Sequence, residues 1–331
     1  YCLNILALFL LSLTLYKSSS QSPLKAYFWA ALGFKLLAGV SLGLIYMHYY
    51  DYGDTLSYFQ EACKYVDIAG EDFSTYLKSL YYDSYTPFRP IYHNEPRALF
   101  ISKVTSVFAL ITDKNYWITS AYYSLFSFAG LWAFANVVHR LYENKLAVLL
   151  SLFLFPSVVF WSSGITKESL AIAPLAWLCA SFLEYMHDRE KISVRRLLFD
   201  CIALALLWHI RYFYAGVFVL TVTSGIVTFL MANYFSWLKN RAVFQLMIFI
   251  FSAMVMTLAI SLTKENFHLD NIANVITQNH DALVSKSDDA GIIHYNDIDG
   301  SFFSLVKNIP KALIGGLFRP WPTDGEGLLA Y

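Results

Sequence analysis

The chain has 331 residues, of which 57% are hydrophobic and only 15% are charged, and its mean hydropathy is +0.47. Because a soluble domain is usually about one-quarter charged, this composition excludes an ordinary soluble domain and indicates an integral membrane protein. The formal net charge is zero, so we expect no nucleic-acid partner. The four cysteines form neither a CxxC metal motif nor a disulfide framework.

Apolar runs of about 17–25 residues are long enough to cross a bilayer. Such runs occur at 27–48, 116–138 and 242–262, and residues 1–16 resemble a shortened first span. Both ends of the chain look cut, since it opens without Met and stops as an apolar run begins, so we expect further spans.

Two longer apolar regions contain polar interruptions. The run 197–236 is broken at His209 and Arg211, which predicts two helices, and the region 146–186 divides at Trp161–Ser169. Together with the other runs, these pieces predict an all-α, polytopic integral membrane protein with about eight transmembrane helices.

The stretch 98–112 is short and carries Lys103, which favours a helix lying along the membrane surface over one that crosses it. If it does not cross, four links fall on one side of the membrane: 17–26, 139–145, 187–196 and 237–241. They hold ten Lys and Arg against three Asp and Glu, and such an excess marks the cytoplasmic side. If 98–112 crosses, this partition is lost.

The opposite side then receives 49–97, with eight acidic and four basic residues, and 264–310, with seven and three. The first segment holds thirteen aromatic residues, so we predict amphipathic helices on the membrane surface rather than a free linker. The second is either a small appendage or a mobile loop. We therefore expect a transmembrane helical domain at 1–262, and at 263–331 an extracytoplasmic loop that re-enters the membrane as a truncated span.

Four polar stretches share this outer side, and the first contains Asp51 and Asp54 at the end of the second span. A carboxylate there could accept a proton from a sugar hydroxyl or help to hold a metal ion. Asp54 is favoured because Gly53 permits the close approach of a ligand. The alternative is that both aspartates cap the next helix and stay solvated.

The same loop ends with His93, Glu95 and Arg97 just before the chain returns to the membrane. Glu95 is a candidate second acid, or a partner of Asp54 in a divalent metal site, although no cofactor is required. The alternative for Arg97 is that it only extends its charged end to the interface.

The most distinctive pattern is Phe155–Ser169, in which Pro156 and Gly164 break an apolar run before Lys167 and Glu168. Ser163 or Thr166 can cap the following helix, whose first amides beside Lys167 would form an anion site suited to phosphate. A plain hairpin turn with a Lys167–Glu168 charge pair is the alternative.

Two further stretches carry cations. Arg211 lies between apolar segments and needs a carboxylate or a phosphate as a partner, while His209 either supports it or is structural. Arg319 and Trp321 together suit a sugar phosphate or a lipid headgroup, although Pro320 and Pro322 also simply stiffen a re-entry loop.

No HExxH, GxSxG, Walker or GxGxxG motif is present, which argues against a zinc protease, a hydrolase with a nucleophile elbow, an ATPase and a nucleotide-dependent dehydrogenase. The pattern of spans and loops, with Asp51 or Asp54 in the first large outer loop and Lys167, Arg211 or Arg319 near later ones, resembles GT-C-type glycosyltransferases that use polyprenyl-phosphate sugars. It is also similar to membrane proteins of bacterial exopolysaccharide assembly.

This resemblance implies a multi-pass protein of the bacterial inner membrane that transfers a sugar from a polyprenyl-phosphate carrier to a glycan, lipid or protein acceptor at the periplasmic face. Asp54 or Asp51 would be the base, and Lys167, Arg211, Arg319 and His209 would bind the lipid phosphate. The acceptor or metal-site candidates are His93, Glu95, Arg97, Glu168 and Trp321. The alternatives are a polymerase or ligase of lipid-linked oligosaccharides, a transporter or flippase, and a non-catalytic assembly component.

Overall fold

The computed structural model describes residues 1–20, 22–50, 53–187, 193–263, 269–285, 295, 298 and 300–318, and these residues form helices and connections without any strand. The all-α prediction is therefore confirmed for the described part of the chain. By its contacts the chain divides into two compact units, Tyr1–Val219 and Leu220–Tyr331. The expected boundary near residue 262 rests on membrane topology, which this division does not test.

The first unit contains α1 (Cys2–Ser18), α2 (Phe28–His48), α3 (Asp54–Glu71), α4 (Phe73–Tyr81), α5 (Pro96–Ile111), α6 (Tyr116–Tyr142), α7 (Lys145–Leu149), the π-helix η3 (Leu150–Leu154), α8 (Pro156–Trp161), α9 (Lys167–His187) and most of α10 (Val194–Tyr234). Short 3₁₀ turns lie at η1 (Lys25–Tyr27), η2 (Asp83–Tyr85) and η4 (Ser236–Leu238). The second unit holds the rest of α10, with α11 (Ala242–Thr263), α12 (Leu269–Val284) and α13 (Phe302–Phe318).

Five segments of the described chain are long and apolar enough to cross a membrane: Lys25–His48, Tyr116–Tyr142, Lys167–His187, Val194–Tyr234 and Ala242–Ala259. These apolar helices indicate a membrane protein. The finer prediction of about eight spans is not confirmed, because α1 and Lys145–Leu154 are apolar but shorter. The 41-residue α10 has a non-helical backbone at Arg211, with φ −142° and ψ 78°, so the predicted break in that run is present as a kink.

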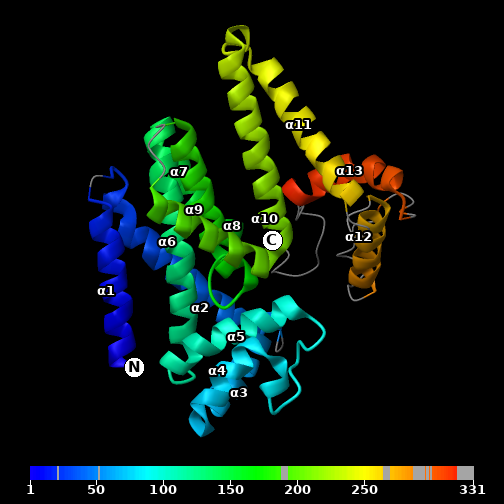
Figure 1. Ribbon diagram of the computed structural model, residues 1–331. Coiled ribbons are helices and arrows are strands. Elements are labelled where there is room, and N and C mark those ends of the chain that lie inside the picture. The colour runs from blue at the N-terminus through cyan, green and yellow to red at the C-terminus, as the bar shows by residue number, and fades with distance from the viewer. Residues whose placement is uncertain are drawn as a thin grey trace. The chain divides into compact units, whose positions relative to one another are not determined.

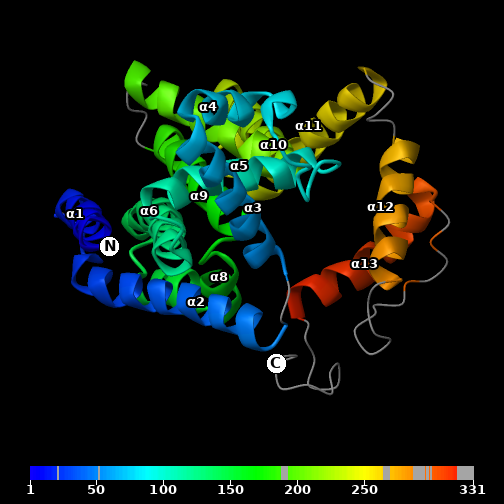
Figure 2. The same cartoon turned by 90° about the horizontal axis from the view of Figure 1, so that it is seen from below.

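The long helices of the first unit run back and forth between two ends (Figures 1 and 2). Hydrogen bonds at the two ends of α1 show which parts of α6 lie beside them. At the start of α1 the side chain of Asn4 accepts a hydrogen bond from the hydroxyl of Tyr122, over 2.9 Å, near the start of α6. After the end of α1 the Ser19 hydroxyl accepts from the indole of Trp132, over 2.6 Å. The link after α1 therefore lies at the far end of α6 from Tyr116.

The helices α6 and α9 pack closely because small residues face each other. A Cβ on Gly130 would lie 2.3 Å from the carbonyl oxygen of Ala173, so only glycine allows this approach. Small residues permit such close backbone contact between membrane helices. Beside the crossing, an aromatic cluster that includes Phe28, Phe128 and Trp132 fills the core.

The segment 49–97 contains the helices α3 and α4, and with α5 they gather at the end where α6 begins (Figure 1). Thr105 of α5 lies 2.6 Å from the hydroxyl of Tyr123 on α6, and Lys103 forms an ion pair with Asp83 over 2.7 Å. Asp83 therefore compensates the charge of Lys103, which was one reason to predict that 98–112 does not cross the membrane. The prediction that α3 to α5 lie on the membrane surface stays a prediction.

Candidate functional site

A cavity of about 330 Å³ lies where the starts of α3 and α9 meet the kink of α10. All of its lining residues belong to the first unit: Tyr46, Asp54, Thr55, Tyr58, Trp161, Thr166, Lys167, Glu168 and Arg211. Three outer stretches that the sequence singled out, around Asp54, Lys167 and Arg211, therefore come together. The structure shows that these residues are close together, and the roles predicted for them as base and phosphate ligands stay predictions.

Asp54 is the first residue of α3, and Gly53 before it sets the entry of the chain. Gly53 has φ +157°, and a Cβ there would lie 2.3 Å from the ring of Tyr46. The sequence suggested that this glycine makes room for a ligand, but in the structure it makes room for Tyr46. The tyrosine forms one wall of the cavity beside Asp54.

The carboxylate of Asp54 accepts a hydrogen bond from the hydroxyl of Tyr58 over 3.1 Å. Burial raises the pKa of Tyr58 well above its ordinary value, and the charge of Asp54 raises it further, so the phenol keeps its proton at neutral pH. The start of α3 has no side-chain cap, so the capping alternative fails for Asp54. Its side chain is exposed on the cavity side.

The loop 162–166 is folded by hydrogen bonds from its own small residues. Thr166 accepts from the amide of Ser169 over 3.0 Å and provides the predicted cap of α9, whereas the hydroxyl of Ser163 donates to the carbonyl of Val159 over 2.6 Å. Gly164 has φ +69° and its amide donates to Ser124 over 3.0 Å. The first amides of a helix lack intrahelical acceptors; Thr166 caps that of Ser169, and the two residues before it, Lys167 and Glu168, line the cavity.

Lys167 and Glu168 have different partners, and they do not form the charge pair of the hairpin alternative. The ammonium of Lys167 lies 5.3 Å from the centre of the Tyr58 ring and has no ion pair with any described residue. Glu168 instead pairs with Arg211, because neighbouring residues of a helix face different directions. Of the two cations that line the cavity, Arg211 is therefore paired with a carboxylate, whereas Lys167 is paired with none among the described residues.

Arg211 sits at the kink of α10, where the non-helical backbone turns its side chain toward α9. One end of its guanidinium pairs with Glu168, while its Nε is buried and has no hydrogen-bond partner among the described residues. A buried donor without an acceptor costs about 1–3 kcal/mol. An anion in the cavity could supply the missing acceptor.

Four of the predicted site residues that the structure describes do not line this cavity. Arg97 stacks on Tyr212 at 3.9 Å, and His93 contacts Arg89 over 2.6 Å. His209 contacts the carbonyl of Ala205 over 2.8 Å and lies beside Phe100, as its structural alternative requires. Glu95 is exposed before α5, and Asp51, Arg319 and Trp321 lie outside the described residues.

The divalent metal suggested for Asp54 and Glu95 has no assembled donor set in the described residues. No group of three or more His, Cys, Asp or Glu side chains there could hold a metal ion, and Glu95 does not line the cavity. The suggestion of a metal therefore receives no support from the geometry around Asp54.

Two buried ionisable residues near the site were missed in the sequence. Lys35, in the middle of α2, is fully buried and donates to the hydroxyl of Ser162 in the loop beneath the cavity. Glu61 on α3 is also fully buried and accepts from the amide of Ile91 over 2.5 Å, while its other oxygen has no partner among the described residues. A charge inside an apolar run is itself an indication of function, and Lys35 in 27–48 could have been found that way.

No protein-family model matches the chain, and no curated protein or solved structure with which it was compared matches it either.

Proposed function

We propose that the protein transfers a sugar from a polyprenyl-phosphate carrier to a hydroxyl of a glycan, lipid or protein acceptor, as GT-C-type enzymes do, at the periplasmic face of a bacterial inner membrane. The observation that carries this proposal is the shared cavity of Asp54, Lys167 and Arg211. It combines two cations and a helix start with one carboxylate that forms no ion pair with a described residue. A phosphate leaving group and a hydroxyl nucleophile need this combination.

In the proposed reaction Asp54 takes the proton of the acceptor hydroxyl. The acceptor oxygen forms a bond to the anomeric carbon, and the bond between that carbon and the phosphate oxygen breaks. The phosphate oxygen leaves with the electron pair. Lys167, the buried Nε of Arg211 and the first amides of α9 stabilise its charge, which is the usual way in which fixed donors lower such a barrier.

The ion pair between Arg211 and Glu168 has a role in the empty site. An unpaired guanidinium in an apolar environment costs several kcal/mol, and Glu168 offsets this cost, while the buried Nε is left without an acceptor among the described residues. Tyr58 holds Asp54 through one carboxylate oxygen, so the other oxygen can face the acceptor.

The experiment has a binding arm and a transfer arm, both with the full chain in lipid nanodiscs. For binding, native mass spectrometry compares undecaprenyl phosphate with undecaprenol. We expect retention of the phosphate form only, weakened at least ten-fold by Lys167→Gln and by Arg211→Gln. Lys78→Gln is the matched control, since Lys78 is exposed on α4 outside the cavity.

The transfer arm follows radiolabelled sugar from the lipid-linked fraction into the glycan of cells that carry each variant. Asp54→Asn keeps an oxygen that accepts from Tyr58, so the fold and phosphate binding should persist, whereas transfer should fall about 10²–10⁴-fold with the loss of the base. Unchanged transfer in Asp54→Asn would reject the carboxylate base and favour the polymerase or ligase alternative, which relies on the arginines.

A transporter or flippase is the second candidate, favoured by the kink of α10 at Arg211 and by Pro174 inside α9. Interrupted helices that meet at a ligand site are a common feature of transporters. Counterflow of labelled lipid-linked sugar in proteoliposomes, without a new glycosidic bond, would establish this candidate over the transferase.

A further inference from the structure

A second and larger cavity, of about 990 Å³, lies at the other end of α6 and α9. The helix α9 contributes residues to both cavities, whereas α6 lines the second one only. Lys167 lines the first cavity and Glu184 the second, and at about 1.5 Å of rise per residue these positions on α9 lie about 26 Å apart. The second cavity is therefore a separate site within the first unit.

Much of its polar lining comes from three segments that the sequence placed in one group by charge, namely the link after α1, the last turn of α6 and the start of α10, and α9 adds the rest together with Asn136 of α6. Arg140, Arg195 and Arg196 line it together with Glu143 and Glu184. Among the described lining residues, Arg195 is the arginine for which no ion pair is found. Serine hydroxyls from the link and from α9 add donors around these charges.

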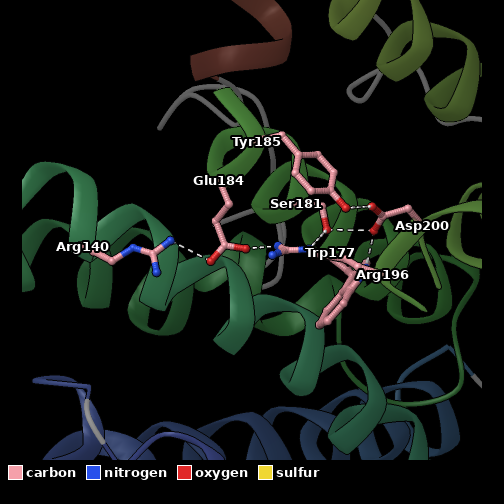
Figure 3. A network of polar contacts seen from close by, with 7 residues as sticks. All are labelled: Arg140, Trp177, Ser181, Glu184, Tyr185, Arg196 and Asp200. Carbon is pink, nitrogen blue, oxygen red and sulfur yellow. Dashed lines mark hydrogen bonds and ion pairs between the residues drawn. The ribbon is translucent and has the colours of Figure 1, made fainter. Parts of the chain in front are cut away.

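Two of the arginines are held in place by a network of hydrogen bonds and ion pairs (Figure 3). Glu184 lies between them, pairing with Arg140 over 2.7 Å and also with Arg196. Asp200 accepts from the indole of Trp177 over 2.9 Å and from the hydroxyl of Ser181 over 2.8 Å. Because Glu184 and Asp200 already have these partners, the guanidinium groups of Arg140 and Arg196 are held in place without a ligand.

Two groups in the cavity have no such compensation. His139 is only 9% exposed, lines the cavity, and its Nδ1 has no hydrogen-bond partner among the described residues. Arg195 is exposed, lies 6.0 Å from the Phe199 ring, and forms no ion pair with a described residue. An anion that reached both side chains would remove a buried unsatisfied atom and an uncompensated charge at once.

We propose that this cavity binds a phosphate-bearing anion, held by Arg195 and His139 and flanked by the fixed guanidinium of Arg196. Arginine suits phosphate because its planar fork can donate two parallel hydrogen bonds. The cavity volume is at the upper end of the range for small-molecule sites, with Trp177 and Phe199 as aromatic walls. A soluble diphosphate and a phospholipid headgroup share this chemistry, and the inference does not depend on the function proposed for the Asp54 cavity.

The test uses the full chain in phosphatidylcholine nanodiscs, with two probes that separate the sources. Equilibrium binding of radiolabelled inorganic pyrophosphate reports a soluble ligand. Native mass spectrometry with added phosphatidylglycerol reports a lipid ligand. For one of the two probes we expect saturable binding that Arg195→Gln and His139→Gln each weaken at least ten-fold. The exposed side chain of Arg195 makes that variant a mild change for the fold.

Lys17→Gln is the matched control, since Lys17 is exposed in the last turn of α1, near the same end, and does not line the cavity. Binding that survives in Lys17→Gln supports a built site. Binding of neither probe, or an equal loss in all three variants, would overturn the proposal, because the second result shows attraction by net charge alone. Binding that Arg195→Gln weakens and Lys167→Gln does not is assigned to this cavity, and the opposite result would assign it to the first cavity and overturn the proposal.

Discussion

Lys35 is a fully buried amine in the middle of α2, and Ser162 is the acceptor that it reaches. It forms no ion pair within the described residues. A buried polar group without an acceptor costs about 1–3 kcal/mol, while removal of both partners is often nearly neutral. The stability of this pair should therefore depend on whether one side or both sides are removed.

We predict that Ser162→Ala lowers the apparent Tm in detergent more than the double variant Lys35→Met and Ser162→Ala does. The single variant leaves the amine without its acceptor, whereas the double variant replaces it with an apolar chain of similar length. Thermal unfolding followed by tryptophan fluorescence measures both. A double variant that is less stable than Ser162→Ala would show that the amine of Lys35 itself stabilises the loop.

Asp72 provides the one side-chain cap of α4, accepting from the amides of Ser74 and Thr75 over 3.0 and 3.2 Å. The hydroxyl of Thr75 and these amides lower the pKa of the Asp72 carboxyl below its usual value. A lowered pKa in the folded state means that the carboxylate stabilises the fold above the unfolded pKa, near 3.8. That contribution is lost as the pH falls through the folded value.

We predict that Asp72→Ala destabilises α4 at pH 6 and that its difference from the parent protein disappears on acidification below the folded pKa. Asp72→Asn is the control, because asparagine also caps helices but does not titrate in this range. Hydrogen exchange of the α4 amides, corrected for the intrinsic rate at each pH, gives the measurement. A difference between Asp72→Ala and parent that stays constant down to pH 2 would contradict the prediction.

At the scale of helices, the contact between α6 and α9 depends on Gly130. A Cβ at this position would lie 2.3–2.8 Å from three backbone atoms of Ala173, and backbone atoms cannot rotate away as a side chain can. Overpacking of this kind costs about 1–3 kcal/mol, which exceeds the gain of about 1 kcal/mol in helix propensity from glycine to alanine.

Gly130→Ala should therefore lower the apparent Tm, and Gly33→Ala should leave it unchanged or raise it. A Cβ on Gly33 of α2 would meet nothing within 4 Å, so that variant gains propensity without a clash. Both are measured in the same detergent by thermal unfolding. Equal behaviour of the two variants would mean that α6 and α9 are free to separate at Ala173.

The long apolar helices were largely predictable where the apolar run meets a charged residue, as α6 does before Glu143 and α9 does at Lys167. The break at Arg211 and the cap at Thr166 follow from a cation and a hydroxyl placed between apolar runs. The contact of Gly130 with Ala173 was not predictable, since a single sequence does not say which faces of two apolar helices meet. The number of spans stays a prediction, because short apolar segments such as 1–16 do not reveal whether they cross.

The cavity around Asp54 was predictable in part, because polar residues at the ends of neighbouring apolar spans gather on the side of the membrane where those spans end. Asp54, Lys167 and Arg211 satisfy this condition, and they line one cavity. The second cavity was missed, although Asp200 and Glu184 are ionisable residues within or beside apolar runs. Their partners come from α6, α9 and α10, and only the packing of those helices brings them together.

At the scale of the whole chain, the two cavities of the first unit define two ends, and charge predicts which membrane side each faces. Lys78 on α4 belongs to the acidic segment 49–97, and Lys17 belongs to the links that are rich in cations. Cationic links are retained on the cytoplasmic side. The helix α6, with 27 residues and thus about 40 Å long, is long enough to separate the two sides across a hydrocarbon core of about 30 Å.

We predict that a membrane-impermeant maleimide labels Lys78→Cys in intact spheroplasts and labels Lys17→Cys only after permeabilisation, in a background with the four native cysteines replaced. Both lysines are exposed, so access across the membrane decides the labelling. Labelling of both cysteines in intact spheroplasts would place the ends on one side and contradict the spanning role of α6. The reverse pattern would keep two sides but put the Asp54 cavity in the cytoplasm, where a periplasmic transfer reaction could not use it.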